Sequence, residues 1–160
     1  MHDGIQVAEA IMDEHNAISV IETLIETCRD GQKGYQDAAS HVKRSDLKTY
    51  FHQQSLERAS FSGELEAALI WMGKPDKKVS GSVGGALRRA WIDAKVSLGG
   101  GDKTILDSVE AGEDSAREAY NKAMTSHLPE DITQIVRRQA ASVQSAHDRV
   151  KTLRDTATAA

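Results

Sequence analysis

The sequence predicts an all-α protein, a four-helix bundle built from two antiparallel helical hairpins. The first observation is that apolar side chains recur every three or four residues over four long stretches, which places them on one face of a helix. The second is that proline occurs only at Pro75 and Pro129, each just after such a stretch has ended. The third is an internal duplication, in which a shift of 85 positions superimposes Tyr35 on Tyr120 without a gap.

The duplication relates residues throughout the two halves of the chain. It keeps the apolar pattern of the first half in phase with that of the second, so each half is expected to fold as one hairpin. The length of 160 residues suits one domain over residues 1–160 with a core of its own. The other identical pairs are Ala38 with Ala123, Asp46 with Asp131, Gln54 with Gln139 and Ser60 with Ser145.

The first hairpin is predicted from two apolar faces separated by a short connection at about 43–46, which makes the helices antiparallel neighbours. An N-terminal extension, residues 1–13, precedes it as a separate short helix or as a leading part of the first helix. Asp46 is the expected N-cap of the second helix, because its carboxylate can accept from free backbone N–H groups. The inward positions are Ile18, Ile21, Ile25, Cys28, Gln32, Tyr35, Ala39 and Val42, followed by Leu47, Phe51, Gln54, Arg58, Phe61, Leu65, Ala68 and Met72.

The second hairpin follows the same pattern, with a short connection at about 126–130. Two long helices are again expected to pack as antiparallel neighbours. The inward positions are Ile105, Val109, Glu113, Ala116, Tyr120 and Ala123 on the third helix, and Ile132, Val136, Gln139, Val143, Ala146, Val150 and Leu153 on the fourth.

Residues 73–102 form the predicted crossover, which is long enough to return along the bundle and join the two hairpins. Val83, Leu87, Trp91 and Leu98 recur within it at helical spacing and predict a short amphipathic helix. This apolar stripe has two interpretations. It either covers the bundle or docks a partner.

Four glycines lie inside the predicted helices, at Gly31, Gly34, Gly63 and Gly112. A glycine in a helix interior costs about 1 kcal/mol relative to alanine. Close approach to a bulky neighbour is the usual offset, so we expect the bundle to be tightly packed at its waist.

The composition excludes several classes of function. The chain has 20 Lys and Arg against 24 Asp and Glu, with no long run of like charge, so a basic nucleic-acid surface is not expected. No apolar stretch approaches the ~20 residues of a membrane span, and the N-terminus lacks the features of a secretory signal. We therefore expect a cytoplasmic protein, and the single cysteine, Cys28, agrees with a reducing compartment.

Several residues on or near the inward faces could bind a metal. Metal sites in helical bundles use carboxylates and histidines from facing helices, because residues three or four apart share a face. Glu113 lies on the inward face of the third helix, with Glu110 one turn before it, and His147 lies beside the inward face of the fourth, with Gln144 one turn earlier. The turn at 126–130 brings Glu113 and His147 to roughly the same level of the bundle, at about 1.5 Å of rise per residue.

Five segments carry a resemblance to a known family. They are Leu24–Gly31, then Glu57–Arg58 with Phe61 and Glu64, Gly81–Val83 with Ala86, Leu87 and Trp91, Gly112–Asp114 with Tyr120, and Ala146–Val150. Together they resemble a bacterial family of ferritin-like four-helix-bundle proteins of uncharacterised function, domain of unknown function 2383, and more distantly ferritins and rubrerythrins. The resemblance covers residues ~16–156. It implies a ferritin-like bundle and says little about activity.

The chain departs from the di-metal pattern of those distant relatives. Cys28 stands where the first helix would supply a glutamate, and Ala59 and Ser62 stand where the second would supply its pair. Glu22 also lies close to an inward face. The metal alternative is therefore a degenerate iron or manganese site drawn from Glu113, His147, Glu110, Gln144, Glu26, Glu57 and Glu64.

The same residues also have a structural interpretation without metal. Glu113 could pair with His147, or it could reach Arg58 across the core, and such buried polar contacts fix helix register. Tyr35 and Tyr120 are expected to be core aromatics whose hydroxyl groups have partners. Cys28 is expected to be a small buried residue.

Two functions follow from these observations. We expect a non-catalytic helical protein, in stress response, that acts through self-association as a homodimer or through a protein partner, with Val83, Leu87, Trp91 and Leu98 as the contact surface. The alternative is a di-metal carboxylate protein that handles metal or peroxide. A hydrolase or transferase is not expected, because the sequence has no Ser-His-Asp spacing, phosphate-binding glycine loop or Cys-x-x-Cys.

Overall fold

The computed structural model describes residues 2–73, Trp91 and residues 101–157 of the chain. These residues form helices joined by turns, and no strand occurs among them. The prediction of an all-α protein is therefore confirmed. The helices are α1 (His2–His41), α2 (Ser45–Trp71), α4 (Asp102–Met124) and α5 (Glu130–Thr156).

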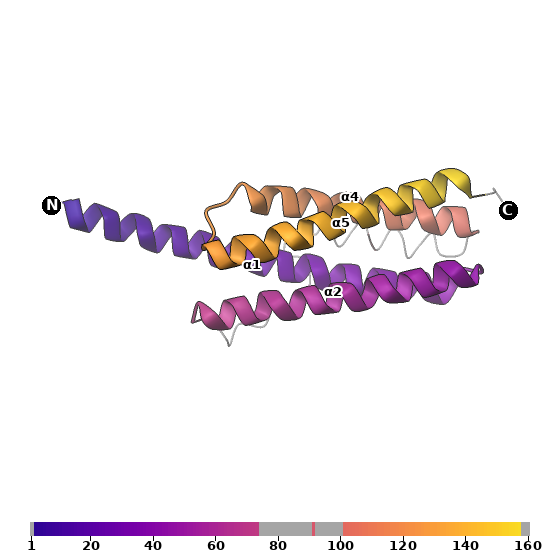
Figure 1. Ribbon diagram of the computed structural model, residues 1–160, viewed down its shortest axis with the longest axis horizontal. Coiled ribbons are helices and arrows are strands. Elements are labelled where there is room, and N and C mark those ends of the chain that lie inside the picture. The colour runs from indigo at the N-terminus through magenta and orange to yellow at the C-terminus, as the bar shows by residue number, and fades with distance from the viewer. Residues whose placement is uncertain (1, 74–90, 92–100, 158–160) are drawn as a thin grey trace.

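The four helices lie along one common direction (Figure 1). Helix α1 packs against α2, and α4 packs against α5, while the two pairs meet mainly through α1 and α4. Helices α2 and α4 run the same way, so the end of α2 and the start of α4 lie at opposite ends of the bundle (Figure 1). The amphipathic helix predicted within residues 73–102 lies outside the described residues, apart from Trp91, which is helical.

Helix α1 is the longest of the four at 40 residues, and its first part projects beyond the other helices (Figure 1). The predicted extension is thus a leading part of the first helix. The side chains described before Ala17 are exposed, and burial begins at Ala17.

The start of α2 differs from the prediction that Asp46 is its N-cap. The N-cap is Arg44, which has no side-chain cap hydrogen bond, and Asp46 lies inside the first turn. The Arg44 guanidinium donates to both oxygens of Asp46, at 3.1 and 2.7 Å, which engages the carboxylate. The backbone N–H groups of Lys43 and Arg44 instead donate to Asp102, at 2.8 and 3.0 Å. The first residue of α4 therefore anchors the turn between α1 and α2.

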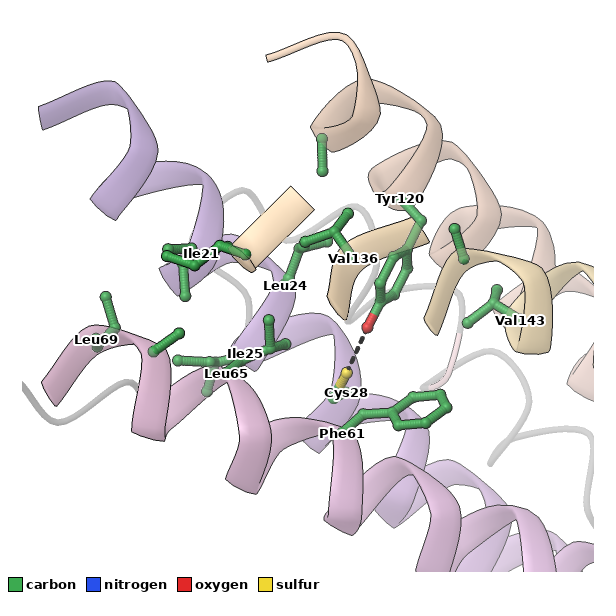
Figure 2. Close-up of a cluster of buried hydrophobic side chains, with 14 of the residues drawn as sticks. Ile21, Leu24, Ile25, Cys28, Phe61, Leu65, Leu69, Tyr120, Val136 and Val143 are labelled. Atoms are coloured by element: carbon green, nitrogen blue, oxygen red, sulfur yellow. Dashed lines mark hydrogen bonds between the residues drawn. The ribbon is translucent and has the colours of Figure 1, made fainter. Parts of the chain in front are cut away.

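The core consists of two clusters of buried side chains that follow one another along the bundle. Figure 2 shows the first, in which Ile21, Leu24 and Ile25 of α1 meet Leu65 of α2 and Val136 of α5. The second lies nearer the turn between α1 and α2. It contains Tyr35, Ala38, Ala39, Val42, Leu47, Phe51, Trp91, Ile105, Leu106, Val109 and Val150.

Trp91 explains two of the helical glycines. A Cβ atom at Gly34 of α1 or at Gly112 of α4 would overlap the indole ring, so the absence of side chains there makes room for it. The Trp91 ring lies 5.5 Å from that of Tyr35, and the residue is only 6% exposed. The expectation of close packing beside the glycines is confirmed at these two positions. Trp91 itself is therefore part of the core.

Gly34→Ala is expected to destabilise the protein, although alanine favours a helix by about 1 kcal/mol. The new methyl group would displace the Trp91 ring from its buried position, and overpacking of this kind costs about 1–3 kcal/mol. Gly63→Ala is the matched control, because nothing lies within 4 Å of a Cβ there. Urea unfolding followed by circular dichroism should give a lower midpoint for Gly34→Ala and an equal or higher one for Gly63→Ala. An equal rise in the urea midpoint of both variants would contradict the close packing of Trp91 against Gly34.

Within the described parts of the chain, no helix has both the length and the apolar composition needed to cross a bilayer.

Candidate functional site

The centre of the bundle holds a buried ion pair between Arg58 of α2 and Glu113 of α4. The Arg58 Nη2 atom donates to both carboxylate oxygens, at 2.6 and 2.7 Å. The two side chains are 1% and 0% exposed. Removing two charges from water is costly, so the pair must keep close geometry to offset that cost. The alternative in which Glu113 reaches Arg58 across the core is confirmed.

Two residues of α1 complete the surroundings of Arg58. Its guanidinium carbon lies 5.5 Å from the centroid of the Tyr35 ring, within the range of a cation–π contact. At Gly31, a Cβ atom would come within 3.0 Å of Arg58 Nη1, so the arginine lies directly against the α1 backbone. The Tyr35 hydroxyl lies beside Glu113 without satisfying hydrogen-bond geometry. Arg58 therefore links α2 to both α1 and α4.

Burial and charge act in opposite directions on this pair. Burial raises the pKa of Glu113, while the charge and the hydrogen bonds of Arg58 oppose the rise. Burial lowers the pKa of Arg58, but Glu113 more than offsets this and the pKa is raised overall. Both oxygens of Glu113 are engaged, so Glu113 could bind a metal only if Arg58 withdrew.

A chain of hydrogen bonds crosses the neighbouring part of the core and joins all four helices. The Tyr120 hydroxyl donates to Gln139 Oε1 at 2.7 Å, so the Cys28 thiol is the donor in its 3.0 Å contact with the Tyr120 oxygen (Figure 2). Gln139 Nε2 in turn lies 3.3 Å from the carbonyl oxygen of Phe61 and 3.2 Å from Glu64 Oε1. Tyr120 is thus a core aromatic with hydroxyl partners, as predicted.

The Cys28 thiol and the Tyr120 hydroxyl in these hydrogen bonds are held neutral. Burial raises the pKa of the Cys28 thiol to about 11 and that of Tyr120 well above its ordinary value. A nucleophilic cysteine requires the thiolate, which the surroundings of Cys28 disfavour. Cys28 is fully buried, as the sequence predicted.

The remaining predicted ligands occupy separate parts of the bundle. Glu64 forms an ion pair with Arg138, and Gln144 Nε2 donates to Asp148 at 3.0 Å. Glu57 lines a groove between α2 and α5. Glu26 is a buried residue of α1.

Three potential ligands meet at the edge where α4 and α5 pack together. Glu110 and Asp114 of α4 and His147 of α5 each offer a ligand atom, and these atoms lie within 4.8 Å of one another. His147 Nε2 is 2.7 Å from Asp114 Oδ1, and its Nδ1 is 3.1 Å from Asp148 Oδ1. The sequence predicts Glu110 and His147 as possible ligands, whereas Asp114 is not among the predicted ligands. The signal for Asp114 is its spacing of four residues from Glu110, which puts both carboxylates on one helix face.

Arg58→Met is expected to cost about 3–5 kcal/mol of stability, because it leaves the Glu113 carboxylate buried without a partner. The double variant Arg58→Met with Glu113→Leu removes both charges and should recover a large part of that loss. Urea unfolding of the single and double variants measures the difference. If the double variant were as unstable as the sum of the two single variants, the pair would not be coupled as the structure indicates.

The Cys28 thiol is expected to react slowly in the native protein. Its pKa is raised from an ordinary 9.0 to about 11, which lowers the thiolate fraction at pH 8 by about 100-fold. The packing around the thiol also limits access of the reagent. Mass spectrometry should show iodoacetamide labelling at least that much slower in buffer than in urea. Native stability should also fall as the pH rises from about 9 to about 11, because the unfolded thiol ionises first. Equal labelling rates in the two solvents would contradict the buried position.

One protein family matches the chain by sequence. It is a domain of unknown function (DUF2383), and the match covers residues 16–126. These residues include α2, α4 and the part of α1 in which burial begins, together with Arg58, Glu113 and the carboxylates of the edge. No curated protein matches the chain. The match spans more than half of the sequence, and the chain therefore belongs to the DUF2383 family.

Proposed function

We propose that this protein is a non-catalytic helical protein that works by self-association through the projecting part of α1. The observation that carries the proposal is that the first part of α1 extends past the other helices (Figure 1) and that every side chain described before Ala17 is exposed. Ile5 is 63% exposed and Val7 is 58% exposed. An isolated helix of this length is marginal in water, so contact with another surface would stabilise it.

A groove beside the base of this segment offers such a surface. It lies between α1 and α4, has a volume of about 510 Å³, and is lined by small side chains such as Ala119 and Ala123 together with Val20. Short side chains on a helix surface allow another helix to approach closely. The groove and the projecting segment lie at the same end of the bundle, so two copies related by a two-fold axis could exchange their α1 segments.

The charges favour this exchange over a direct pairing of two α1 segments. The segment carries Asp3, Glu9, Asp13 and Glu14, and the chain has no Lys or Arg before Arg29. Two such segments side by side would repel each other. Lys122 and His127 line the groove together with Asp13 of the same chain. Lys122 offers a cation to an incoming acidic helix, so a second copy of the chain is the occupant that we propose.

The interior supports a non-catalytic role. Arg58 and Glu113 neutralise each other at the centre, and the Cys28 and Tyr120 protons are held by their neighbours. The alternative of an iron or manganese pair at the centre would require Arg58 to leave Glu113. Of the residues that the sequence suggested for partner contact, Trp91 is buried, and Val83, Leu87 and Leu98 lie outside the described residues.

Self-association can be tested by light scattering after size-exclusion chromatography at about 100 µM protein, a concentration that populates any dimer with a micromolar Kd. The wild-type chain is expected to be a dimer. A double variant, Ile5→Asp with Val7→Asp, should be a monomer with unchanged helix content, because neither side chain packs against the bundle.

Leu56→Asp is the matched control, since Leu56 is 72% exposed on α2, far along the chain from the projecting segment. It should remain a dimer. A monomeric wild type would overturn the proposal, and so would a dimer that survives the double variant but is lost in Leu56→Asp.

A further inference from the structure

We infer that Glu110, Asp114 and His147 form a binding site for a single divalent transition-metal ion at the edge between α4 and α5. The site is separate from the bundle centre, and it stands independently of self-association. Its ligand atoms would be one imidazole nitrogen and at least two carboxylate oxygens, contributed by two adjacent helices.

The spacing of the three side chains suits one ion. Metal–ligand bonds of about 2.1 Å at tetrahedral angles place neighbouring ligand atoms about 3.4 Å apart. The three ligand atoms lie within 4.8 Å of one another, and the His147 and Asp114 atoms are 2.7 Å apart. These values bracket the required separation. Glu110 and His147 are buried, so the rotation that closes the site falls mainly on the exposed Asp114 side chain.

Each ring nitrogen of His147 faces a carboxylate oxygen, an arrangement that a proton or a metal ion on Nε2 satisfies. Asp148 Oδ1 lies 3.1 Å from Nδ1, and in the tautomer that carries its proton on Nδ1 the Nε2 lone pair is directed at Asp114 Oδ1. A lone pair facing a carboxylate oxygen at 2.7 Å is repulsive unless a proton or a metal ion lies between them. A carboxylate that orients a histidine through its other nitrogen is the usual support of a metal-binding imidazole. His147 is 5% exposed, so its ring is held in place.

Two arginines compete for the same carboxylates and would have to yield. Arg154 pairs with Glu110, and Arg117 lies 3.4 Å from Asp114. The guanidinium side chains are 29% and 36% exposed, so both can turn into solvent. The pair of Arg117 and Asp114 is exposed and contributes little stability, whereas Glu110 is buried and would need the metal ion to replace Arg154. Three carboxylates, counting Asp148, surround the imidazole against two arginines, which leaves an excess of negative charge for a cation.

The ligand set identifies the class of ion. Imidazole favours zinc, copper, iron and nickel, whereas carboxylates also accept manganese, so a mixed site of this kind selects first-row transition metals over magnesium or calcium. Copper(II) should bind more tightly than zinc, in accordance with the usual order of divalent affinities. Three protein ligands leave at least one coordination position to water.

The test is calorimetric titration of the full-length, metal-free chain with Zn²⁺, and with Mg²⁺ for comparison. We expect one Zn²⁺ per chain and a rise in Tm on binding, because the ion binds the folded state alone. Asp114→Asn should weaken Zn²⁺ binding at least tenfold. Asp114 is 52% exposed, so this variant is expected to fold normally, which circular dichroism can verify.

Three further variants make the result decisive. His147→Gln should abolish the site, and Asp148→Asn should weaken binding about 10–100-fold at unchanged stoichiometry, as for other residues that orient a ligand. His52→Gln is the control, because His52 is an exposed histidine of α2 and should leave the affinity unchanged. Absence of Zn²⁺ binding below about 1 mM would overturn the inference, and so would equal affinities in the wild type and Asp114→Asn.

Discussion

The buried pair of Arg58 and Glu113 is the constraint around which the bundle is arranged. Each charge can be removed from water only if the other meets it at hydrogen-bond distance, so α2 and α4 are fixed in both spacing and register. Arg58 also lies against Gly31 and over Tyr35, which extends the same constraint to α1. A shift of any of these helices by one residue would leave a charge buried without its partner, whereas the apolar contacts around the pair would tolerate small shifts.

The neighbouring features follow from this close approach. Helices drawn together at the level of Arg58 need small residues where another side chain enters, and Gly34 and Gly112 admit the ring of Trp91. The hydrogen bonds from Cys28 through Tyr120 to Gln139 then satisfy the polar groups of the adjacent layer, in which an unpaired group would be costly. These polar contacts inside the apolar core therefore fix the register of the helices.

The sequence predicts the helices and their inward faces well, because both depend on the spacing of apolar residues along the chain. It also indicates that Gly34 and Gly112 need a bulky neighbour, since their cost requires an offset. It fails where the outcome depends on competition between side chains. Arg44 takes the carboxylate of Asp46, which was expected to cap α2, and Asp102, distant in sequence, binds the turn instead. Asp114 was missed because it looks like an ordinary surface acid until α5 places His147 beside it.

The internal repeat predicted from the sequence allows the interior of the bundle to be compared with its edge. A shift of 85 positions relates Cys28 to Glu113 and Tyr35 to Tyr120. Tyr120 lies beside Cys28, and Tyr35 lies beside Glu113, so each tyrosine contacts a residue of the other hairpin. The same shift relates the edge residues Glu110, Asp114 and His147 to Ile25, Arg29 and Ser62, none of which carries a carboxylate or an imidazole. The interior therefore keeps an approximate correspondence between hairpins, while the edge does not. Requirements of packing act on both hairpins alike, so chemistry confined to one of them points to a role other than stability.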